Sequence, residues 1–179
     1  MIILISGPIN SGKTTVGKAL AALLPRTAHL EVDTLRELVH FLPLEAAIPI
    51  NLENAAAITS NLARRGIGVI LTYPLGEEDY DYLLRAFADL PTAIHTFILG
   101  PTLETALVDR GERRLSDHER RRIREQYQDN RHQPAFGIQI DNTAQTPEET
   151  ATMIVQRIRA SRNTRGRWAV NFPPSGRAW

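Results

Sequence analysis

The feature that most constrains this fold is the stretch GPINSGKTT, residues 7–15, which directly follows the apolar run MIILIS. It matches the pattern G-x-x-x-x-G-K-[ST], which requires a strand before it and a helix after it. The glycines let successive backbone N–H groups point into one concave site, to which the helix N-terminus adds its positive dipole end. The stretch therefore predicts a loop that binds the phosphates of a nucleoside triphosphate.

The chain has two lysines and nineteen arginines, and one of the two lysines, Lys13, lies inside this motif. A compact ammonium on a flexible stem is not equivalent to a planar guanidinium, so Lys13 is predicted to contact the β- and γ-phosphates. The Thr14 hydroxyl is predicted to bind Mg²⁺. The predicted nucleotide-binding residues of the loop are Gly7, Asn10, Ser11, Gly12, Lys13, Thr14 and Thr15.

Composition excludes several classes of protein. With 179 residues the chain fits one domain that buries a core without covalent cross-links. The absence of cysteine excludes disulfides, thiolate metal sites and cysteine nucleophiles. A net charge of +1 argues against a dedicated nucleic-acid-binding protein. Since the first apolar run is too short for a signal peptide and no run is long enough for a membrane span, we expect a cytoplasmic protein with no membrane partner.

Apolar, β-branched runs alternate with helical patterns, which is typical of βαβ units in an α/β fold with a parallel sheet. The predicted strands are residues 2–6, 28–32, 67–73, 93–99 and 137–141. The predicted helices are 16–24, 34–41, 51–65 and 76–90, with two more starting at capping boxes at Ser116 and Thr146. Residues 42–50 contain two prolines and are predicted to form a loop or a broken helix.

The stretch EVDTLR ends the second predicted strand. Asp33 would lie at the carboxyl end of a parallel strand, where open α/β sheets bind ligands, with Arg36 one helical turn further on. There Asp33 can accept the proton of a substrate hydroxyl, and Arg36 can hold an anionic or polar acceptor. Alternatively, Asp33 is only the N-cap of the next helix and Arg36 lies on a solvated face. Glu31 could reach a magnesium-bound water or pack in the interior, and both interpretations stay open.

Residues 110–131 contain eight arginines and five carboxylates. If the segment is helical at its start, Arg110, Arg113 and Arg114 form one basic edge. Arginines on a closing lid can stabilise the charge of a transferred phosphoryl group, and one of them could instead stack on adenine. We assign Arg113 and Arg114 to catalysis and Arg110 to the nucleotide. The remaining arginines are predicted to lie on a solvated helix face with glutamate partners: Arg120, Arg121, Arg122 and Arg124.

Several stretches occur in the order found in small P-loop kinases: GPINSGKTT, EVDTLR, VILTYPL, VDRGERRLSDHERRRIREQY and IDNTAQTPEET. Over residues 2–160 the chain resembles shikimate kinase, gluconate kinase, chloramphenicol phosphotransferase and the zeta-toxin and polynucleotide kinase relatives. The resemblance implies a three-layer α/β/α fold of the P-loop nucleoside triphosphate hydrolase type with a five-stranded parallel sheet. It also implies an acceptor-binding helical region after the second strand and a lid at about 110–131.

The resemblance implies roles for single residues as well. Asp33 matches the acidic residue near the acceptor hydroxyl, and Asp33-x-x-Arg36 resembles the pair of the zeta-toxin and polynucleotide kinase branch. The implied cofactors are ATP and Mg²⁺, and no guanine-reading N-K-x-D motif occurs. Where many P-loop proteins end the third strand in a magnesium-supporting aspartate, this chain has Thr72, so Glu31 or Asp33 would take that role. Residues 141–143 would border the base, or form only a turn.

Taken together, the sequence predicts a P-loop kinase domain at residues 1–161 and a C-terminal tail at 162–179. The expected reaction is ATP-dependent, magnesium-requiring transfer of the γ-phosphate to a hydroxyl of a small molecule, a metabolite or an antibiotic. Its catalytic residues would be Lys13, Asp33, Arg113 and Arg114, with Asp33 and Arg36 binding the acceptor. The mostly apolar region 40–60 could line the acceptor pocket or only pack in the core.

Two alternatives remain open at this level. The Asp33-x-x-Arg36 pair and the basic stretches 110–131 and 162–167 fit a nucleotide or polynucleotide 5′-hydroxyl kinase, which would make nucleic acid a partner. A nucleotide-gated interaction module with weak ATPase activity would instead dock its partner through the tail, with Trp168 and Trp179. The sequence makes no prediction of the oligomeric state.

Overall fold

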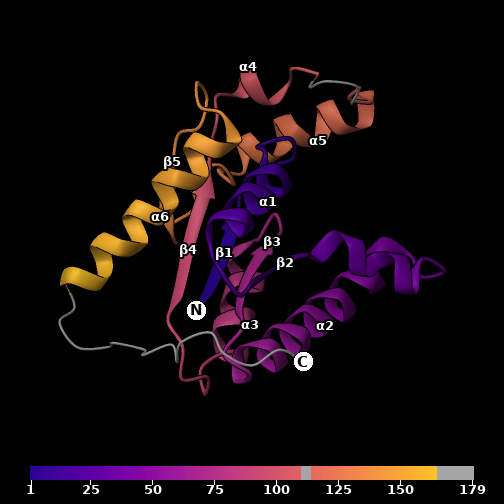
Figure 1. Ribbon diagram of the computed structural model, residues 1–179. Helices are drawn as coiled ribbons and strands as arrows, with labels where there is room; N and C mark the ends of the chain where they lie inside the picture. Colours follow the sequence, from indigo (N-terminus) through magenta and orange to yellow (C-terminus); the bar gives the residue numbers. More distant parts are fainter. Residues whose placement is uncertain (110–113, 165–179) are drawn as a thin grey trace.

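The computed structural model describes residues 1–109 and 114–164, and its centre is one sheet of five parallel strands in the order β2-β3-β1-β4-β5 (Figure 1). The strands are β1 (Ile2–Ser6), β2 (Thr27–Glu31), β3 (Gly68–Thr72), β4 (Ile94–Leu99) and β5 (Ile138–Ile140). Each strand lies within one residue of its predicted bounds at either end. The α/β class with a five-stranded parallel sheet is therefore confirmed.

Helices cover both faces of the sheet (Figure 1). They are α1 (Lys13–Leu23), α2 (Leu44–Arg64), α3 (Glu77–Ala86), α4 (Leu103–Ala106), α5 (Asp117–Gln128), α6 (Pro147–Thr164) and the 3-10 helix η1 (Val32–Val39). The side chains of β1 alternate between two cores: Ile2 and Leu4 pack on the α2 and α3 side, whereas Ile3 and Ile5 pack on the α1 and α6 side. This alternation confirms the three-layer α/β/α arrangement.

Residues 44–50 are helical, so the prediction of a loop or a broken helix over 42–50 is wrong for all of that stretch except Leu42 and Pro43. The helix α2 has Pro43 as its N-cap and runs through Pro49 to Arg64. Pro49 removes one helical N–H donor, but the helix also buries Ala47, Leu52 and other side chains on one face, and tertiary packing of this kind decides most helices. Gly66, with φ +73, ends α2 as predicted.

The two predicted capping boxes are present. The Ser116 hydroxyl accepts the Glu119 N–H at 3.2 Å, and Glu119 accepts the Ser116 N–H at 2.9 Å. Thr146 and Glu149 exchange the same pair of bonds at 3.2 and 2.8 Å. These two capping boxes fix the starts of α5 and α6, the helices that come before and after β5 in the chain.

The α4–α5 region lies beyond the carboxyl ends of β1 and β4 (Figure 1). The last helix, α6, runs to Thr164, past the predicted domain end at residue 161. Residues 165–179 lie outside the described part, so the division into domain and tail stays a prediction. Among residues 1–109 and 114–164, no helix combines the length and the apolar character that crossing a membrane requires.

Candidate active site

The phosphate loop connects β1 to α1 and depends on two glycines. Gly7 has φ +140, and a Cβ atom there would lie 2.2 Å from the Leu99 carbonyl oxygen, so a side chain does not fit. Gly12 has φ +91 and forms the N-cap of α1. Because both positions need a backbone that other residues rarely adopt, the loop curls back over the N-terminus of α1, which is the arrangement that binds phosphate.

Lys13 begins α1 and lies over the loop. Its Nζ atom donates hydrogen bonds to the carbonyl oxygens of Gly7 at 3.0 Å and Pro8 at 2.7 Å. A cavity of about 450 Å³ opens here, and its walls include Gly12, Lys13, Thr14, Glu31 and Asp33. The Lys13 ammonium, which is predicted to contact phosphate, therefore borders a cavity that is also lined by the carboxylates of Glu31 and Asp33.

Glu31 ends β2 and points at the phosphate loop. Its carboxylate accepts a hydrogen bond from the Thr14 hydroxyl, so the interpretation of Glu31 as a packing residue is wrong. Thr72 at the end of β3 also lines the cavity, and its hydroxyl is 3.0 Å from Nε2 of His29. Burial lowers the pKa of His29, which favours the neutral imidazole beside Thr72.

The oxygen atoms of Thr14 and Glu31 form a donor set that suits Mg²⁺. Within the described part of the chain, no group of three or more His, Cys, Asp or Glu side chains could hold a metal ion alone. Magnesium in kinase sites is bound through one or two carboxylates and the phosphates of the nucleotide, with water in the remaining positions. The residues present therefore fit a magnesium ion that arrives with the nucleotide.

Two buried amides that the sequence did not single out hold the loop from behind. Oε1 of Gln126, on α5, accepts the Ile9 N–H at 2.7 Å. Nδ2 of Asn142, after β5, donates to the Ser11 carbonyl at 2.9 Å. Both side chains are almost completely buried, so these bonds satisfy loop groups that water cannot reach. Neither contact is predictable from a local sequence pattern, because the partners are 117 and 131 residues apart.

Asn10 was predicted to bind nucleotide, and the structure shows a contact of another kind. It has φ +61, and its Nδ2 donates to the carbonyl oxygens of Ala106 at 2.8 Å and Val108 at 3.0 Å. The side chain thereby ties the phosphate loop to α4 and to the segment that leads into the arginines. Its contact with nucleotide stays a prediction.

The sequence predicted that Arg110, Arg113 and Arg114 form one basic edge of a helix, but Arg114 is not helical. Arg114 lies in a non-helical segment before α5, is 84% exposed, and pairs with Asp109 at 3.3 Å. Hydrogen bonds from the Leu115 N–H and from Arg114, together with the charge of Arg120, lower the pKa of Asp109. The capping box at Ser116 explains why helix begins only at Asp117. Arg110 and Arg113 lie outside the described residues.

Arg120 also corrects a prediction, because it is not a solvated partner of glutamate. It is 2.8 Å from Asp109 and donates to the Leu107 carbonyl at 2.6 Å, which joins α5 to the end of α4. Arg122 does pair with Glu125, at 3.0 Å, on the exposed face as predicted.

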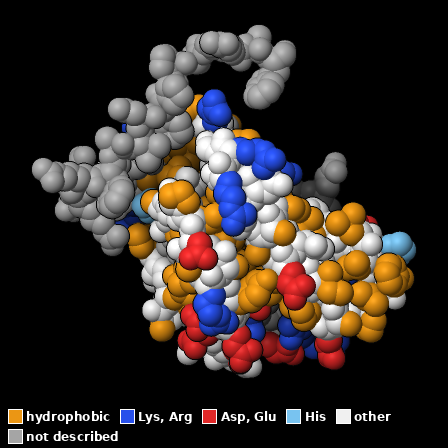
Figure 2. Space-filling view, turned by 90° about the horizontal axis from the view of Figure 1, so that it is seen from below, with side chains coloured by type: hydrophobic (Ala, Val, Ile, Leu, Met, Phe, Trp, Pro, Cys, Tyr) orange, Lys and Arg blue, Asp and Glu red, His pale blue; other side chains and the backbone are white. Residues whose placement is uncertain are grey.

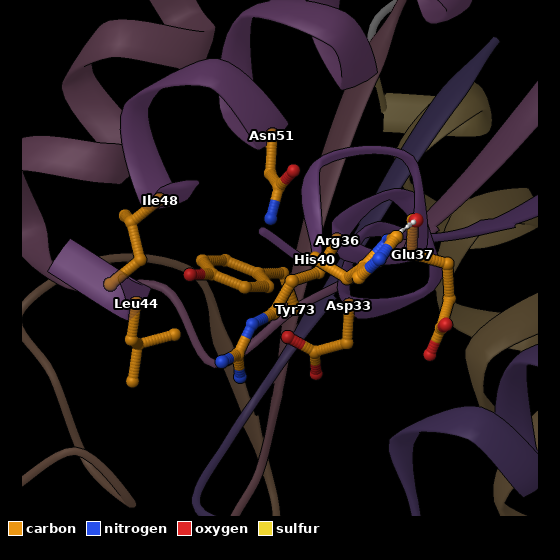
Figure 3. Close-up of a pocket in the computed structure, with 8 residues that line it drawn as sticks. All are labelled: Asp33, Arg36, Glu37, His40, Leu44, Ile48, Asn51 and Tyr73. Carbon is orange, nitrogen blue, oxygen red and sulfur yellow. Dashed lines mark hydrogen bonds between the residues drawn. The ribbon is translucent and has the colours of Figure 1, made fainter. Parts of the chain in front are cut away.

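A second cavity of about 360 Å³ lies between η1, α2 and the residue after β3 (Figure 3). Asp33 and Arg36 come from η1, Leu44 and Asn51 from α2, and Tyr73 follows β3. In Figure 3 the Asn51 amide lies on one side of the Tyr73 ring, with the Asp33 carboxylate and the Arg36 guanidinium on the other. This cavity occupies the region where an acceptor pocket was expected.

Asp33 lines both cavities. It is not an N-cap: Glu31 precedes η1, and Asp33 belongs to the first turn of that helix. Asp33 is exposed as a residue, but partial burial of its carboxylate raises the pKa of Asp33, while Lys13 and Arg36 act in the opposite direction and Glu31 adds to the increase. Burial, with the charges of Asp33 and Asp79, raises the pKa of Tyr73 to about 12, so its hydroxyl stays protonated.

The segment from η1 to the start of α2, which lines part of the second cavity, carries exposed hydrophobic side chains. Leu38, Phe41 and Leu44 are 67%, 73% and 50% exposed. Figure 2 shows hydrophobic side chains gathering on the right-hand side of the molecule, where η1 and the start of α2 lie. The predicted apolar character of region 40–60 is thus expressed partly at the surface beside the cavity and partly in the core.

The loop after β5 is a turn closed by Asp141. Its carboxylate accepts hydrogen bonds from the N–H of Thr143 at 2.9 Å and from the hydroxyl of the same residue at 2.5 Å. These bonds lower the pKa of Asp141. The contact of this loop with a nucleotide base stays a prediction.

Comparison with known proteins agrees with this geometry. Residues 1–159 match the family of chloramphenicol phosphotransferase-like proteins. The comparison with curated proteins finds no match. A gluconokinase from Sinorhizobium meliloti 1021 is 20% identical with a TM-score of 0.64, covering 92% of this chain and 97% of its own.

Two further solved structures are similar. Shikimate kinase from Aquifex aeolicus vf5 is 19% identical with a TM-score of 0.58, covering 93% of this chain and 100% of its own. The tunicamycin resistance protein of Deinococcus radiodurans is 19% identical with a TM-score of 0.60, covering 88% and 94%. At these identities the structures establish the fold. The family match spans nearly the whole described chain, so the chain belongs to the chloramphenicol phosphotransferase-like family, P-loop phosphotransferases of the kinase type.

Proposed function

We propose that this protein is an ATP-dependent, magnesium-requiring kinase that transfers the γ-phosphate to a hydroxyl of a small molecule, a metabolite or an antibiotic. The observation that carries the proposal is the position of Asp33, which lines the phosphate cavity and the neighbouring cavity at once. A phosphoryl group beside Lys13 and a hydroxyl in the second cavity would meet at this carboxylate. Such a meeting point is what in-line transfer between two bound substrates requires.

Asp33 is the acceptor-side base in this proposal. The acceptor O–H proton passes to the Asp33 carboxylate, a bond forms between the acceptor oxygen and the γ-phosphorus, and the bond from that phosphorus to the bridging oxygen of ADP breaks. A raised pKa makes a carboxylate a stronger base, and burial raises the pKa of Asp33. Arg36, in the same cavity, holds an anionic or polar part of the acceptor.

The remaining charges serve the nucleotide. Lys13 would leave its loop carbonyls for the β- and γ-phosphates, and Thr14 with Glu31 would hold Mg²⁺, which neutralises phosphate charge when bound. Arg113 and Arg114 are proposed to stabilise the transferred phosphoryl group. The exposed pair between Arg114 and Asp109 is of the kind that contributes little to stability, so the guanidinium can exchange this partner for a phosphate oxygen.

A small acceptor is favoured over an oligonucleotide by the walls of the second cavity. Its volume of about 360 Å³ and the apolar Leu44 and Ile48 suit a compact molecule with an apolar part. In the described part of 110–131, Arg120 and Arg122 already have carboxylate partners, which weakens the case for a phosphate-backbone surface. The 5′-hydroxyl kinase and the nucleotide-gated interaction module stay alternatives, the latter resting on a tail beyond the described residues.

The test is to incubate the protein with Mg-ATP and a pool of hydroxyl-bearing metabolites, antibiotics and short oligonucleotides. Mass spectrometry then detects any compound that gains one phosphoryl group. A phosphorylated small molecule that disappears with Asp33→Asn supports the reaction and the role of Asp33. A product that persists in this variant refutes Asp33 as base, and phosphorylated oligonucleotides alone would favour the alternative kinase.

A further inference from the structure

Asn51 is a polar residue in a position where a helix normally buries an apolar one. It lies on the face of α2 that packs toward the sheet, and it is only 5% exposed. Its Oδ1 atom is enclosed by protein, and within the described residues it has no hydrogen-bond partner. Buried side-chain amides are normally hydrogen-bonded, so an unpaired one needs a reason.

The position of Asn51 offers that reason, because the residue lines the cavity that also holds Asp33 (Figure 3). The amide is directed toward the space beside the Tyr73 ring, with Ile48 one turn earlier on the same helix. An amide presents an acceptor at Oδ1 and donors at Nδ2, and a half-turn of the group exchanges them. It can therefore pair with a ligand group that donates and accepts, such as a hydroxyl or a secondary amide.

We propose that Asn51 is a specificity-determining residue that binds a second polar group of the phosphoryl acceptor, an inference that rests on the proposed function. The acceptor then has three parts: a reacting hydroxyl at Asp33, an apolar body against Leu44 and Ile48, and a hydroxyl or amide at Asn51. An alcohol without that second group leaves the amide unpaired in the complex and binds more weakly. The chemical class is a compact, amphiphilic alcohol with at least one further neutral polar group.

A stability measurement without ligand separates this role from a structural one. Asn51→Leu removes an unpaired buried amide and keeps the number and branching of the side-chain heavy atoms, so we expect an unfolding temperature equal to or above that of the unmodified protein. The matched control is Thr59→Val on the same helix, since Thr59 is buried, has an unpaired Oγ1 among the described residues, and lines neither cavity. A drop of several degrees for Asn51→Leu would overturn the proposal, because it would show that Asn51 supports the fold.

Binding is then compared for two probes that differ in one group, N-(2-hydroxyethyl)benzamide and its ester analogue 2-hydroxyethyl benzoate. Calorimetry in the presence of a non-hydrolysable ATP analogue and Mg²⁺ measures both affinities. We expect the unmodified protein and Thr59→Val to bind the amide about tenfold more tightly than the ester. Asn51→Leu is expected to bind both equally. Equal or undetectable binding of the two probes by the unmodified protein, or a preference that survives in Asn51→Leu, would overturn the inference.

Release of ADP with the same probes separates this inference from the proposed function. An amide preference that needs Asn51, without any ADP release, supports the binding role and counts against phosphoryl transfer to such alcohols. If ADP release is the same for both probes, and the same for the unmodified protein and Asn51→Leu, the result supports the kinase activity and contradicts the role of Asn51.

Discussion

The two cavities that meet at Asp33 are built in opposite ways. On the phosphate side, side chains from distant parts of the chain fix the loop: Gln126 holds Ile9, and Asn142 holds Ser11. On the acceptor side, the side chains of Arg36 and Asn51 make no hydrogen bond or ion pair with any described residue. Hydrophobic side chains of the adjoining η1–α2 segment are exposed, and Phe41 is the most exposed of them.

This difference has a physical explanation. A loop that is hydrogen-bonded before the nucleotide arrives loses little conformational freedom on binding, which suits a substrate with fixed phosphate geometry. Unpaired polar groups in a cavity gain their partners only when a ligand supplies them, so they contribute discrimination between ligands rather than stability of the fold. The phosphate side is therefore held in place before any ligand binds, and the second cavity is where we propose that the acceptor is selected.

The largest effect should come from the residue that the two cavities share. We expect Asp33→Asn to lower kcat by about 10²–10⁴-fold, the range of a positioned general base. ATP affinity, which depends mainly on the other residues of the phosphate cavity, should change little. Transfer assays and nucleotide titrations check the two halves of this expectation. A comparable loss of ATP affinity would show that Asp33 belongs to the nucleotide site instead.

The same variant has a stability signature of known sign. Because burial raises the folded-state pKa of Asp33, the folded protein holds this proton more tightly than the unfolded chain, and stability falls as pH rises through that pKa. Asp33→Asn lacks this loss, so at pH 7 its unfolding temperature should be slightly higher than that of the unmodified protein. Below the ordinary aspartate pKa the difference should vanish. A lower unfolding temperature at pH 7 would contradict the raised pKa.

Lys13→Arg is the next largest change, and it acts on the phosphate side alone. The charge is kept, but the planar guanidinium cannot follow the tight path of the ammonium over the loop, so we expect about a 10²–10³-fold loss in kcat. Binding of the acceptor probes should be unaffected. Lys18→Arg is a matched control, since Lys18 is the other lysine of the chain and is exposed on α1. Equal losses in both variants would remove the special role of Lys13.

Most elements of the fold could be predicted from local patterns in the sequence. The predictions failed or were missing where contacts between distant parts of the chain decide the structure. The five strands could be predicted because each is a short run rich in apolar or β-branched residues between turn signals, and the loop could be predicted because its glycines and lysine stand in a fixed pattern. Strand order depends on pairing between distant segments, which no local pattern contains. Pro49 misled the prediction for α2, since the packing of that helix against the sheet outweighs one missing hydrogen bond.

The site was predictable where a residue follows a strand and hidden where it acts across the fold. Asp33 and Glu31 were candidates because the carboxyl ends of parallel strands gather at one edge. Asn51 lies in the middle of α2, and the sequence predicted only for region 40–60 as a whole that it lines an acceptor pocket or packs in the core. Gln126 lies among arginines on a helix whose pattern predicted a solvated face. Neither position has a spacing relation to the loop or to Asp33, so only the folded chain brings them together.

Gln126→Ala removes one of the hydrogen bonds that hold the phosphate loop in place. The buried Ile9 N–H would lose its acceptor, which costs about 1–3 kcal/mol in the free energy of unfolding. A loosened loop should also bind ATP about tenfold more weakly, with acceptor binding unchanged. Gln128→Ala, on the exposed side of the same helix, should change stability by less than about 0.5 kcal/mol. Denaturant unfolding and nucleotide titration measure both quantities, and identical behaviour of the two variants would mean that the loop does not depend on Gln126.

The smallest effect, and the one that probes the open side most directly, is a shift in pH dependence. The positive charge of Arg36 lowers the pKa of Asp33, so Arg36→Gln should raise that pKa further. Activity is lost as pH falls and Asp33 becomes protonated, and the acidic limb of the kcat/KM profile should therefore move to higher pH in this variant. Arg36→Lys keeps the charge and should leave the limb in place while raising the acceptor KM, because an ammonium does not reproduce the planar fork of a guanidinium. If both variants raise KM and neither moves the limb, Arg36 contacts the acceptor without acting on Asp33, and the pKa of Asp33 would be set by burial, Lys13 and Glu31.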